Sequence, residues 1–297
     1  MVIKNRSKIC LIISAVIIIA ALLLTIFGHG VNLGIDFAGG LSMQYDMKTA
    51  VTTADVTAAL ESIGISKSTV TVQGRDNNEA NIRIKDVSKD DIQKVQANFE
   101  NSIKEKYPEA VSIGDVNYVG PVAGATLLKN AIISVLLATV LMLIYIAIRF
   151  DLNSGLAAVF GLVHDVLIML SFMVIFRSFI QMNSSFIAAA LTIVGYSINN
   201  TIVIFDRIRE NAKKMPTIPR EEVTNISIRE SLGRTICTTV TTLITIVALC
   251  ILGVASIREF ALPIIVGILS GVYSANMING YVWAFLEEKR RSRKAKA

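Results

Sequence analysis

Six long apolar runs constrain the fold of this chain more than any other feature. At about 1.5 Å per residue, helical runs of this length cross a hydrocarbon core of roughly 30 Å. Backbone groups in lipid must be satisfied within the span, so we expect a bundle of six transmembrane helices. A composition with 53% hydrophobic and 18% charged residues agrees with this. The runs cover residues 9–27, 131–148, 155–176, 185–205, 235–254 and 260–286.

The charges between the runs predict the orientation. Lys and Arg gather before the first run, after the fourth and after the sixth, whereas the opposite short loops hold little more than Arg177 and Arg258. Basic flanks remain cytoplasmic, so both termini are predicted to be cytoplasmic. The first run has no small-residue cleavage pattern after it and is interpreted as an uncleaved signal anchor. The net charge of +6 therefore indicates contact with membrane lipid and not with nucleic acid.

The polar segment 30–126 is predicted to be an extracytoplasmic domain. It carries nine Lys and Arg against thirteen Asp and Glu, a net −4, and it contains no cysteine for a disulfide framework. Period-two and helical patterns alternate along it, and the order βαββαβ predicts an α+β ferredoxin-like domain between the first two membrane helices. The chain then divides into 1–29, 30–126 and 127–297. The expected strands are 41–47, 68–73, 80–85 and 111–119, and the expected helices are 53–63 and 88–106.

The fourth run contains two adjacent amides, Asn199 and Asn200, and its apolar part stops at Asp206. Polar groups inside a bilayer are costly and persist mainly where they face protein or a water-filled path. We therefore expect a polar path beside this helix. Asp206 heads a charged run and is interpreted as part of a solvated helix end or a local ion pair.

Several motifs resemble the SecF branch of the SecD/SecF family. Gly-Tyr-Ser-Ile-Asn-Asn-Thr at 195–201, followed by Asp-Arg-Ile-Arg-Glu-Asn at 206–211, is similar to the family's fourth transmembrane helix. Six spans with one external domain also form half of a known transporter plan, whose sites lie between two related halves. Further similarity lies in the glycine motif 34–40, in Val-Gly-Pro at 119–121, in the pair His164-Asp165 and in 225–235.

The resemblance implies a function. A SecF-type subunit of the bacterial cell (inner) membrane would join SecD and the SecY-E-G channel, and would use an ion gradient, of H⁺ or Na⁺, to assist late translocation of the preprotein. An exporter of lipids or small molecules from the same RND superfamily is the alternative. We expect no enzyme, cofactor or metal centre, because no phosphate-binding loop and no catalytic constellation is visible.

One position departs from the family pattern. Asn200 stands where the family carries an aspartate linked to proton movement, and a carboxamide does not titrate. Three explanations remain open: the partner supplies the carboxylates, the path carries Na⁺, or the amide mimics a permanently protonated aspartate. The family also implicates the arginine matching Arg234 in proton transport, although a residue there can instead snorkel to the surface. Asn200 and Arg234 are expected to meet in the inner half of the bilayer.

Other candidate functional residues are identified by their positions in the predicted spans and turns. Thr238 lies on the Arg234 face of the fifth span and lines either a pore or a packing surface. Asp165 is a functional candidate because it is ionisable at mid-membrane. His164 is interpreted as structural, and neighbours on a helix point about 100° apart, so the two are not expected to share one partner. Asp36, with Gly39 and Gly40, is expected at a turn after the first helix, where the resemblance implies a coupling role.

Overall fold

The computed structural model describes residues 3–74, 76–114, 116–178, 180–253 and 255–294. These residues form two compact units. One unit consists of Met1–Asn32, Ile133–Gln181 and Ser185–Ala297, and the other of Leu33–Ile132 with Met182–Ser184. The first is a helical bundle and the second is built around a small sheet.

Six helical segments in the described residues are long and apolar enough to cross a membrane, which confirms the predicted six apolar helices. The last span is interrupted by a turn of π-helix, which the sequence pattern did not predict. The elements are α1 (Ile3–Ile26), α5 (Pro121–Arg149), α6 (Leu152–Ile175), α7 (Ser184–Lys214), α8 (Arg220–Leu252), α9 (Ala255–Ser274), the π-helical turn η2 (Ala275–Asn279) and α10 (Gly280–Lys294).

The charged connection between the fourth and fifth spans is shorter than the distance between the apolar runs 185–205 and 235–254 suggested. α7 continues past Asp206 to Lys214, and α8 begins at Arg220, so only 215–219 lies between the helices. Arg207 and Lys214 each pair with Glu210 at helical spacing, and such pairs stabilise a helix outside the bilayer. Loss of hydrophobicity marked the end of the apolar span but not the end of the helix.

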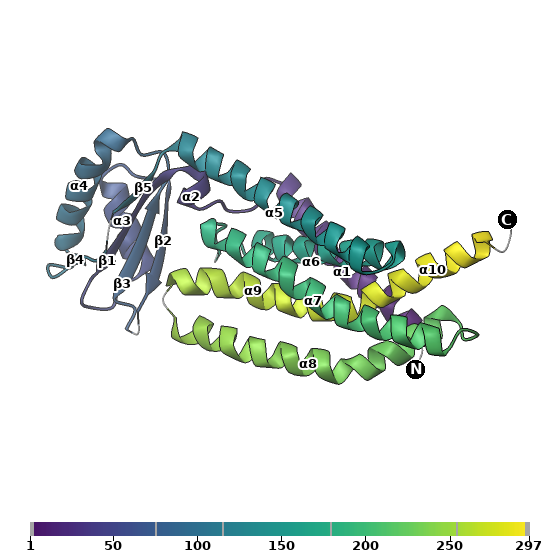
Figure 1. Cartoon of the computed structure of the whole chain (residues 1–297). Coiled ribbons are helices and arrows are strands. Elements are labelled where there is room, and N and C mark those ends of the chain that lie inside the picture. Colours follow the sequence, from purple (N-terminus) through teal and green to yellow (C-terminus); the bar gives the residue numbers. More distant parts are fainter. Residues whose placement is uncertain (1–2, 75, 115, 179, 254, 295–297) are drawn as a thin grey trace. The chain divides into compact units, whose positions relative to one another are not determined.

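The helices of the bundle differ in how much of their surface other helices cover. In α6, α7 and the last span, 50–61% of the apolar window is buried, against 11% in α1, α5 and α8. α9 packs against both α6 and α8, and α1 packs against α6 (Figure 1). A side chain at Gly267 would clash with Ile193, so this small residue allows α9 to approach α7 closely. The outer helices therefore keep large faces for lipid or another subunit.

The second unit contains one five-stranded antiparallel sheet in the order β2-β3-β1-β4, with β5 also paired to β1. Two helices, α3 (Thr53–Ser62) and α4 (Ile92–Lys104), accompany it, and its core includes Leu41, Tyr45 and Phe99. The four strands and two helices expected from the sequence lie within two residues of their predicted ends, except at 88–91 and 111–119. The strands are β1 (Gly40–Asp46), β2 (Ser68–Gln73), β3 (Glu79–Ile84), β4 (Val111–Ser112) and β5 (Asn117–Val119).

Three local details differ from the expectation. The predicted strand 111–119 is split into β4 and β5, which pair with opposite ends of β1. Gly114 lies between the two pieces with φ +80°, a conformation outside the strand region. A 3₁₀ turn, η1 (Lys89–Asp91), precedes α4. The expected turn at Asp36 is a short helix, α2 (Ile35–Ala38).

Candidate functional site

A buried carboxylate lies at the centre of the helical bundle. Asp165 on α6 is 0% exposed, and three serine hydroxyls and an imidazole surround it. Its Oδ2 accepts hydrogen bonds from Ser197 Oγ at 2.5 Å and Ser274 Oγ at 2.8 Å. Its Oδ1 accepts from Ser270 Oγ at 2.7 Å and lies 3.0 Å from His164 Nδ1. These residues, with Ser14, form the Asp165 cluster.

Four helices assemble the Asp165 cluster. Ser197 comes from α7, and Ser270 and Ser274 lie one turn apart on α9, so they reach the same carboxylate. Gly271 makes this possible, because a Cβ there would lie 3.3 Å from the Ser197 Cα and 3.6 Å from Asp165 Oδ2. The fourth helix is α1, whose Ser14 Oγ lies 2.7 Å from His164 Nε2.

The cluster surrounds both oxygens of the Asp165 carboxyl with hydrogen-bonding groups. Each oxygen has two polar neighbours within hydrogen-bond distance. The two ring nitrogens of His164 lie beside Asp165 Oδ1 and Ser14 Oγ. The imidazole therefore connects the carboxyl group on α6 to the Ser14 hydroxyl on α1.

His164 and Asp165 bond each other as well as different helices. His164 reaches α1 and Asp165 reaches α7 and α9, in line with the angle between neighbouring helical residues. The expectation that the two have separate roles missed their direct contact, since both side chains are long enough to meet at 3.0 Å. They form one polar group within the bundle.

The structure does not bring Asn200 and Arg234 together. Asn200 is the residue that departs from the family's ion path, and Arg234 is the one that matches it. Asn200 is 2% exposed, and its buried Nδ2 has no hydrogen-bond partner in the described part of the chain. Arg234 is exposed, and no bond or ion pair of its side chain is formed among the described residues. In the part of α8 that follows Arg234, Thr235 and Thr239 are the buried residues, so the exposed Arg234 points away from the bundle. The expected contact between Asn200 and Arg234 is therefore absent in this chain, while Asn199 is exposed.

The threonines beside Arg234 mostly bond their own helix. The Thr238 hydroxyl donates to the carbonyl oxygens of Arg234 and Thr235, at 2.9 and 3.1 Å, and Thr241 and Thr245 behave similarly. Such bonds satisfy a hydroxyl in a membrane helix without a second helix. Thr238, Thr241 and Thr245 are exposed together with Arg234. They form a polar stripe on a face of α8 that this chain leaves uncovered.

The π-helical turn η2 places two further amides inside the bundle. Asn279 Nδ2 donates to Thr201 Oγ1 on α7 at 2.9 Å, and Asn276 Oδ1 accepts from Thr235 Oγ1 on α8 at 3.5 Å. π-Helical turns of this kind are frequent at functional sites. The sequence shows Asn276 and Asn279 as polar residues in an apolar run, but their spacing did not predict the π-helical turn.

The remaining candidates lie away from the Asp165 cluster. Asp36 Oδ2 accepts a hydrogen bond from the backbone N–H of Ser184, the first residue of α7, at 2.8 Å. Gly39 and Gly40 have φ of +79° and +138°, and a Cβ at Gly40 would clash with the Ile84 carbonyl oxygen. Both positions therefore require glycine. Asp206 is exposed on α7.

Sequence reasoning identified Asp165 but not what surrounds it. Ser197 lies in the recognised motif, and Ser270 and Ser274 were visible as polar residues in the sixth span, yet nothing in the spacing showed that they meet one carboxylate. Ser14 is a single hydroxyl in an apolar run and carried no signal. In the described part of the chain, no group of three or more His, Cys, Asp or Glu residues is arranged to hold a metal ion.

Comparison with known families identifies the chain's relatives. Residues 98–289 match the C-terminal region of the protein export membrane proteins SecD and SecF, and residues 25–51 match the SecD/SecF GG motif. The chain belongs to the SecD/SecF family. The match to the larger region contains most of the Asp165 cluster, and the GG motif contains Gly39 and Gly40.

Individual SecD/SecF proteins agree with this assignment. The chain is 34% identical to the protein translocase subunit SecF of Rickettsia bellii, over 87% of this chain and 84% of that protein. It is 36% identical to the protein translocase subunit SecDF of Bacillus subtilis, over 91% of this chain but only 36% of that protein. The crystal structure of SecDF from Thermus thermophilus superposes with a TM-score of 0.81 at 32% identity, covering 96% of this chain and 38% of that one.

These relatives define the general class of the protein. The SecD/SecF proteins it matches are translocase subunits, with a role in transport rather than catalysis. With six apolar helices, the chain is a multi-pass membrane protein. It spans about a third of the SecDF relatives, in which SecD and SecF are associated in one protein.

Proposed function

We propose that this chain acts as a SecF-type subunit of the Sec export machinery in the bacterial cell membrane. It joins a SecD-type partner and the SecY-E-G channel, and it uses a transmembrane ion gradient to assist late translocation of preproteins. The observation that carries this proposal is the uncovered polar stripe of α8, with the exposed guanidinium of Arg234. A cation on a membrane helix is costly against lipid, so this face calls for a polar surface on another subunit.

The polar stripe of α8 also supports the proposed ion coupling. Asn200 cannot exchange a proton, so we infer that the partner supplies the titrating carboxylate opposite Arg234. Asn200, with its unpaired Nδ2, acts as a neutral hydrogen-bonding group beside this path. Amide and hydroxyl oxygens are also adequate ligands for a hard cation, so Na⁺ is the second candidate ion.

The α/β unit is proposed to be a ferredoxin-like domain outside the cytoplasm, with both termini inside. Its strand order, β2-β3-β1-β4, agrees with that fold, and its net charge of −4 contrasts with the basic flanks of the spans. Within the bundle, α1 begins and α10 ends at the same end, which fits an even number of spans (Figure 1). In this position the domain contacts the emerging preprotein or the partner's external region.

Depletion of the protein tests the function. We expect unprocessed secretory precursors to accumulate in depleted cells, as measured by pulse labelling of an exported protein. Normal precursor processing together with sensitivity to toxic solutes would instead favour the RND-type exporter of lipids or small molecules.

A photo-crosslinking amino acid at Thr238 tests the partnership. This position lies on the polar stripe of α8, so we expect an adduct with the co-expressed SecD-type partner. The matched control is the same amino acid at Leu137 on α5, which is 57% exposed and apolar. No adduct from position 238, or equal adducts from both positions, would contradict a partner seated on the stripe.

The substitution Asn200→Asp tests the ion. If the partner's carboxylate carries protons past a neutral Asn200, a second titrating group should increase proton-driven translocation into membrane vesicles that contain the partner. Asn200→Gln is the control, because it keeps an amide. An unchanged proton dependence in Asn200→Asp would show that position 200 is not on the path, and stimulation of the parent by Na⁺ would identify the second ion.

A further inference from the structure

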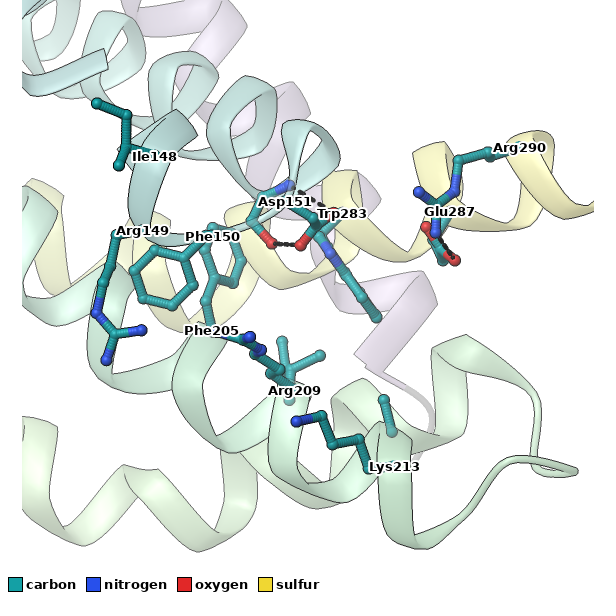
Figure 2. A pocket seen from close by; sticks show the side chains of 13 residues that line it. Ile148, Arg149, Phe150, Asp151, Phe205, Arg209, Lys213, Trp283, Glu287 and Arg290 are labelled. Carbon is teal, nitrogen blue, oxygen red and sulfur yellow. Dashed lines mark hydrogen bonds and ion pairs between the residues drawn. The ribbon is translucent and has the colours of Figure 1, made fainter. Parts of the chain in front are cut away.

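A cavity of about 430 Å³ lies at the charged end of the bundle, apart from the Asp165 cluster. The ends of α5 and α7 and the middle of α10 line it, with Arg149, Arg209, Lys213 and Trp283 among the lining residues (Figure 2). Arg209 and Lys213 lie one turn apart on α7, so both project on the same side of that helix. No part of the ion path proposed above uses these residues.

The carboxylates of the cavity already have partners. Asp151 caps α6, accepting from the Ser154 hydroxyl at 2.5 Å and from the Asn153 backbone N–H at 3.2 Å. Glu287 accepts from Arg290 at 2.8 Å and from the Asn153 amide at 2.7 Å, and Figure 2 shows the bond to Arg290. Both acidic groups are therefore held by structural contacts.

Three cations of the cavity remain without a carboxylate in the described part of the chain. The Arg149 guanidinium lies 5.4 Å from the centroid of the Phe150 ring, and no ion pair of Arg149, Arg209 or Lys213 is formed among the described residues. Three cations that line one cavity attract an anion. Guanidinium groups match phosphate oxygens in a bidentate way, and a lysine adds a point charge.

An apolar track leads away from the same cavity. Ile148 lines the cavity and is 81% exposed, and Ile144 and Leu141, one and two turns earlier on α5, are 51% and 57% exposed. These side chains share one face of a membrane helix. Trp283 lies at the level of the cavity, where amphipathic rings are enriched at membrane interfaces. A ligand that uses both features has an anionic head and an apolar tail.

We propose that this cavity binds the phosphodiester headgroup of an anionic phospholipid, with an acyl chain along α5. Basic pockets between membrane helices on the cytoplasmic side recognise such headgroups. Arg149 and Arg209 hold the phosphate oxygens and Lys213 adds charge at the rim. The proposal needs only the cytoplasmic location of the basic end, and it stands whether or not the chain couples an ion gradient to export.

Trp283 reports on the site directly, because it is the only tryptophan of the chain. The full chain is placed in nanodiscs of phosphatidylcholine that contain a small fraction of phosphatidylglycerol brominated near the headgroup end of its acyl chains, and quenching of Trp283 emission is measured. Brominated phosphatidylcholine at the same fraction is the reference. We expect phosphatidylglycerol to be enriched about fivefold at Trp283, below the roughly hundredfold limit for three unscreened cations.

Two triple variants distinguish binding in this cavity from general electrostatic attraction of the lipid. Arg149→Gln, Arg209→Gln and Lys213→Gln combined should return the quenching to the phosphatidylcholine level. Arg229→Gln, Lys289→Gln and Arg293→Gln remove the same charge from exposed positions outside the cavity, and should leave the enrichment unchanged. Emission in unbrominated nanodiscs shows whether each variant keeps its fold.

Three outcomes would overturn the proposal. Equal quenching by the two brominated lipids would mean that the cavity does not select an anionic headgroup. An equal loss of phosphatidylglycerol enrichment in both triple variants would mean that the overall charge of the protein, and not this cavity, attracts the lipid. Relief of the quenching by inorganic phosphate at cellular concentration would assign the cavity to a free phosphate and not to a lipid.

Discussion

The two units of this chain differ in where they place polar and apolar groups. In the α/β unit, the residues with 0–1% exposure at the centre are apolar or aromatic, such as Leu41, Tyr45 and Phe99. In the helical bundle they include the polar residues Asp165 and Ser274 beside apolar ones such as Met169, while apolar side chains such as Leu136 are 60% exposed. Water expels apolar groups from the surface of the first unit, whereas lipid accepts them on the second.

The same contrast holds for pairs of ionisable side chains. In the α/β unit, Lys67 and Asp86 pair with both side chains more than 70% exposed, and such pairs contribute little to stability. In the bundle, the side chains of His164 and Asp165 pair at 5% and 0% exposure. Removal of one partner from a buried pair is costly because the other groups lose their bonds. The stability of the first unit thus depends mainly on apolar packing, whereas that of the second depends on apolar packing and on buried polar contacts.

The largest expected effect is in the sheet core. Phe99→Ala removes a ring that is 0% exposed and lies 5.1 Å, centroid to centroid, from Tyr45. We expect a loss of about 3–5 kcal/mol in the free energy of unfolding. Hydrogen exchange of β1 and β3 in the full chain measures this loss. Val111→Ala, at a position that is 51% exposed, is the control and should change little. Unchanged exchange in Phe99→Ala would contradict the dependence on apolar packing.

In the bundle, Asp165→Leu should destabilise by about 3 kcal/mol, although it makes the interior more apolar. The hydroxyls of Ser197, Ser270 and Ser274 and the imidazole of His164 lose their acceptor. Denaturant titration in detergent, followed by Trp283 emission, measures the change. The control is Ser171→Ala, since the buried Ser171 hydroxyl on α6 bonds, among the described residues, only the Leu167 carbonyl oxygen. Equal or greater stability of Asp165→Leu would remove the distinction between the units.

The smallest effect concerns pH. The Lys106 ammonium and the Tyr107 hydroxyl, both bonded to Asp55, lower the pKa of Asp55 below its usual range. The folded state therefore binds this proton less tightly than the unfolded chain, whose aspartate pKa is about 3.9. The stabilisation is complete above that pH and is lost as the pH falls through the lower folded pKa.

Hydrogen exchange of α3 at neutral and acidic pH checks this. Asp55→Asn should lower protection near neutral pH slightly and should reduce its loss under acid, because the amide does not titrate. The control Asp86→Asn changes a carboxylate that is 73% exposed. If Asp55→Asn loses protection under acid as steeply as the parent, this ion pair is not the source of the acid sensitivity.

Local patterns of the sequence predicted most elements of both units. The helix predicted from Thr53 to a stop near Gly64 is α3, and the structure shows that Thr52 caps it, with its hydroxyl accepting from the Asp55 backbone N–H at 3.2 Å. Strands β2 and β3 followed from alternation and from the turn between them. The end of α7 was missed, because its charged continuation is stabilised by ion pairs and by burial of Ile208 against the bundle. The hydrophobicity pattern of a sequence gives no information about such contacts.

The amino-acid sequence alone predicted the six spans and the family, and it identified Asp165 as an unusual ionisable residue in an apolar run. It could do so because length, periodicity and the cost of charge in lipid are local properties. Which side chains meet that carboxylate, and which way Arg234 points, depended on helix packing. Ser14 and Ser274 are 260 positions apart, yet they lie in one cluster through His164 and Asp165. Close contact between α7 and α9 at Gly267 and Gly271 brings the serines within reach. The rotation of α8, which buries Thr235 and Thr239, leaves Arg234 exposed.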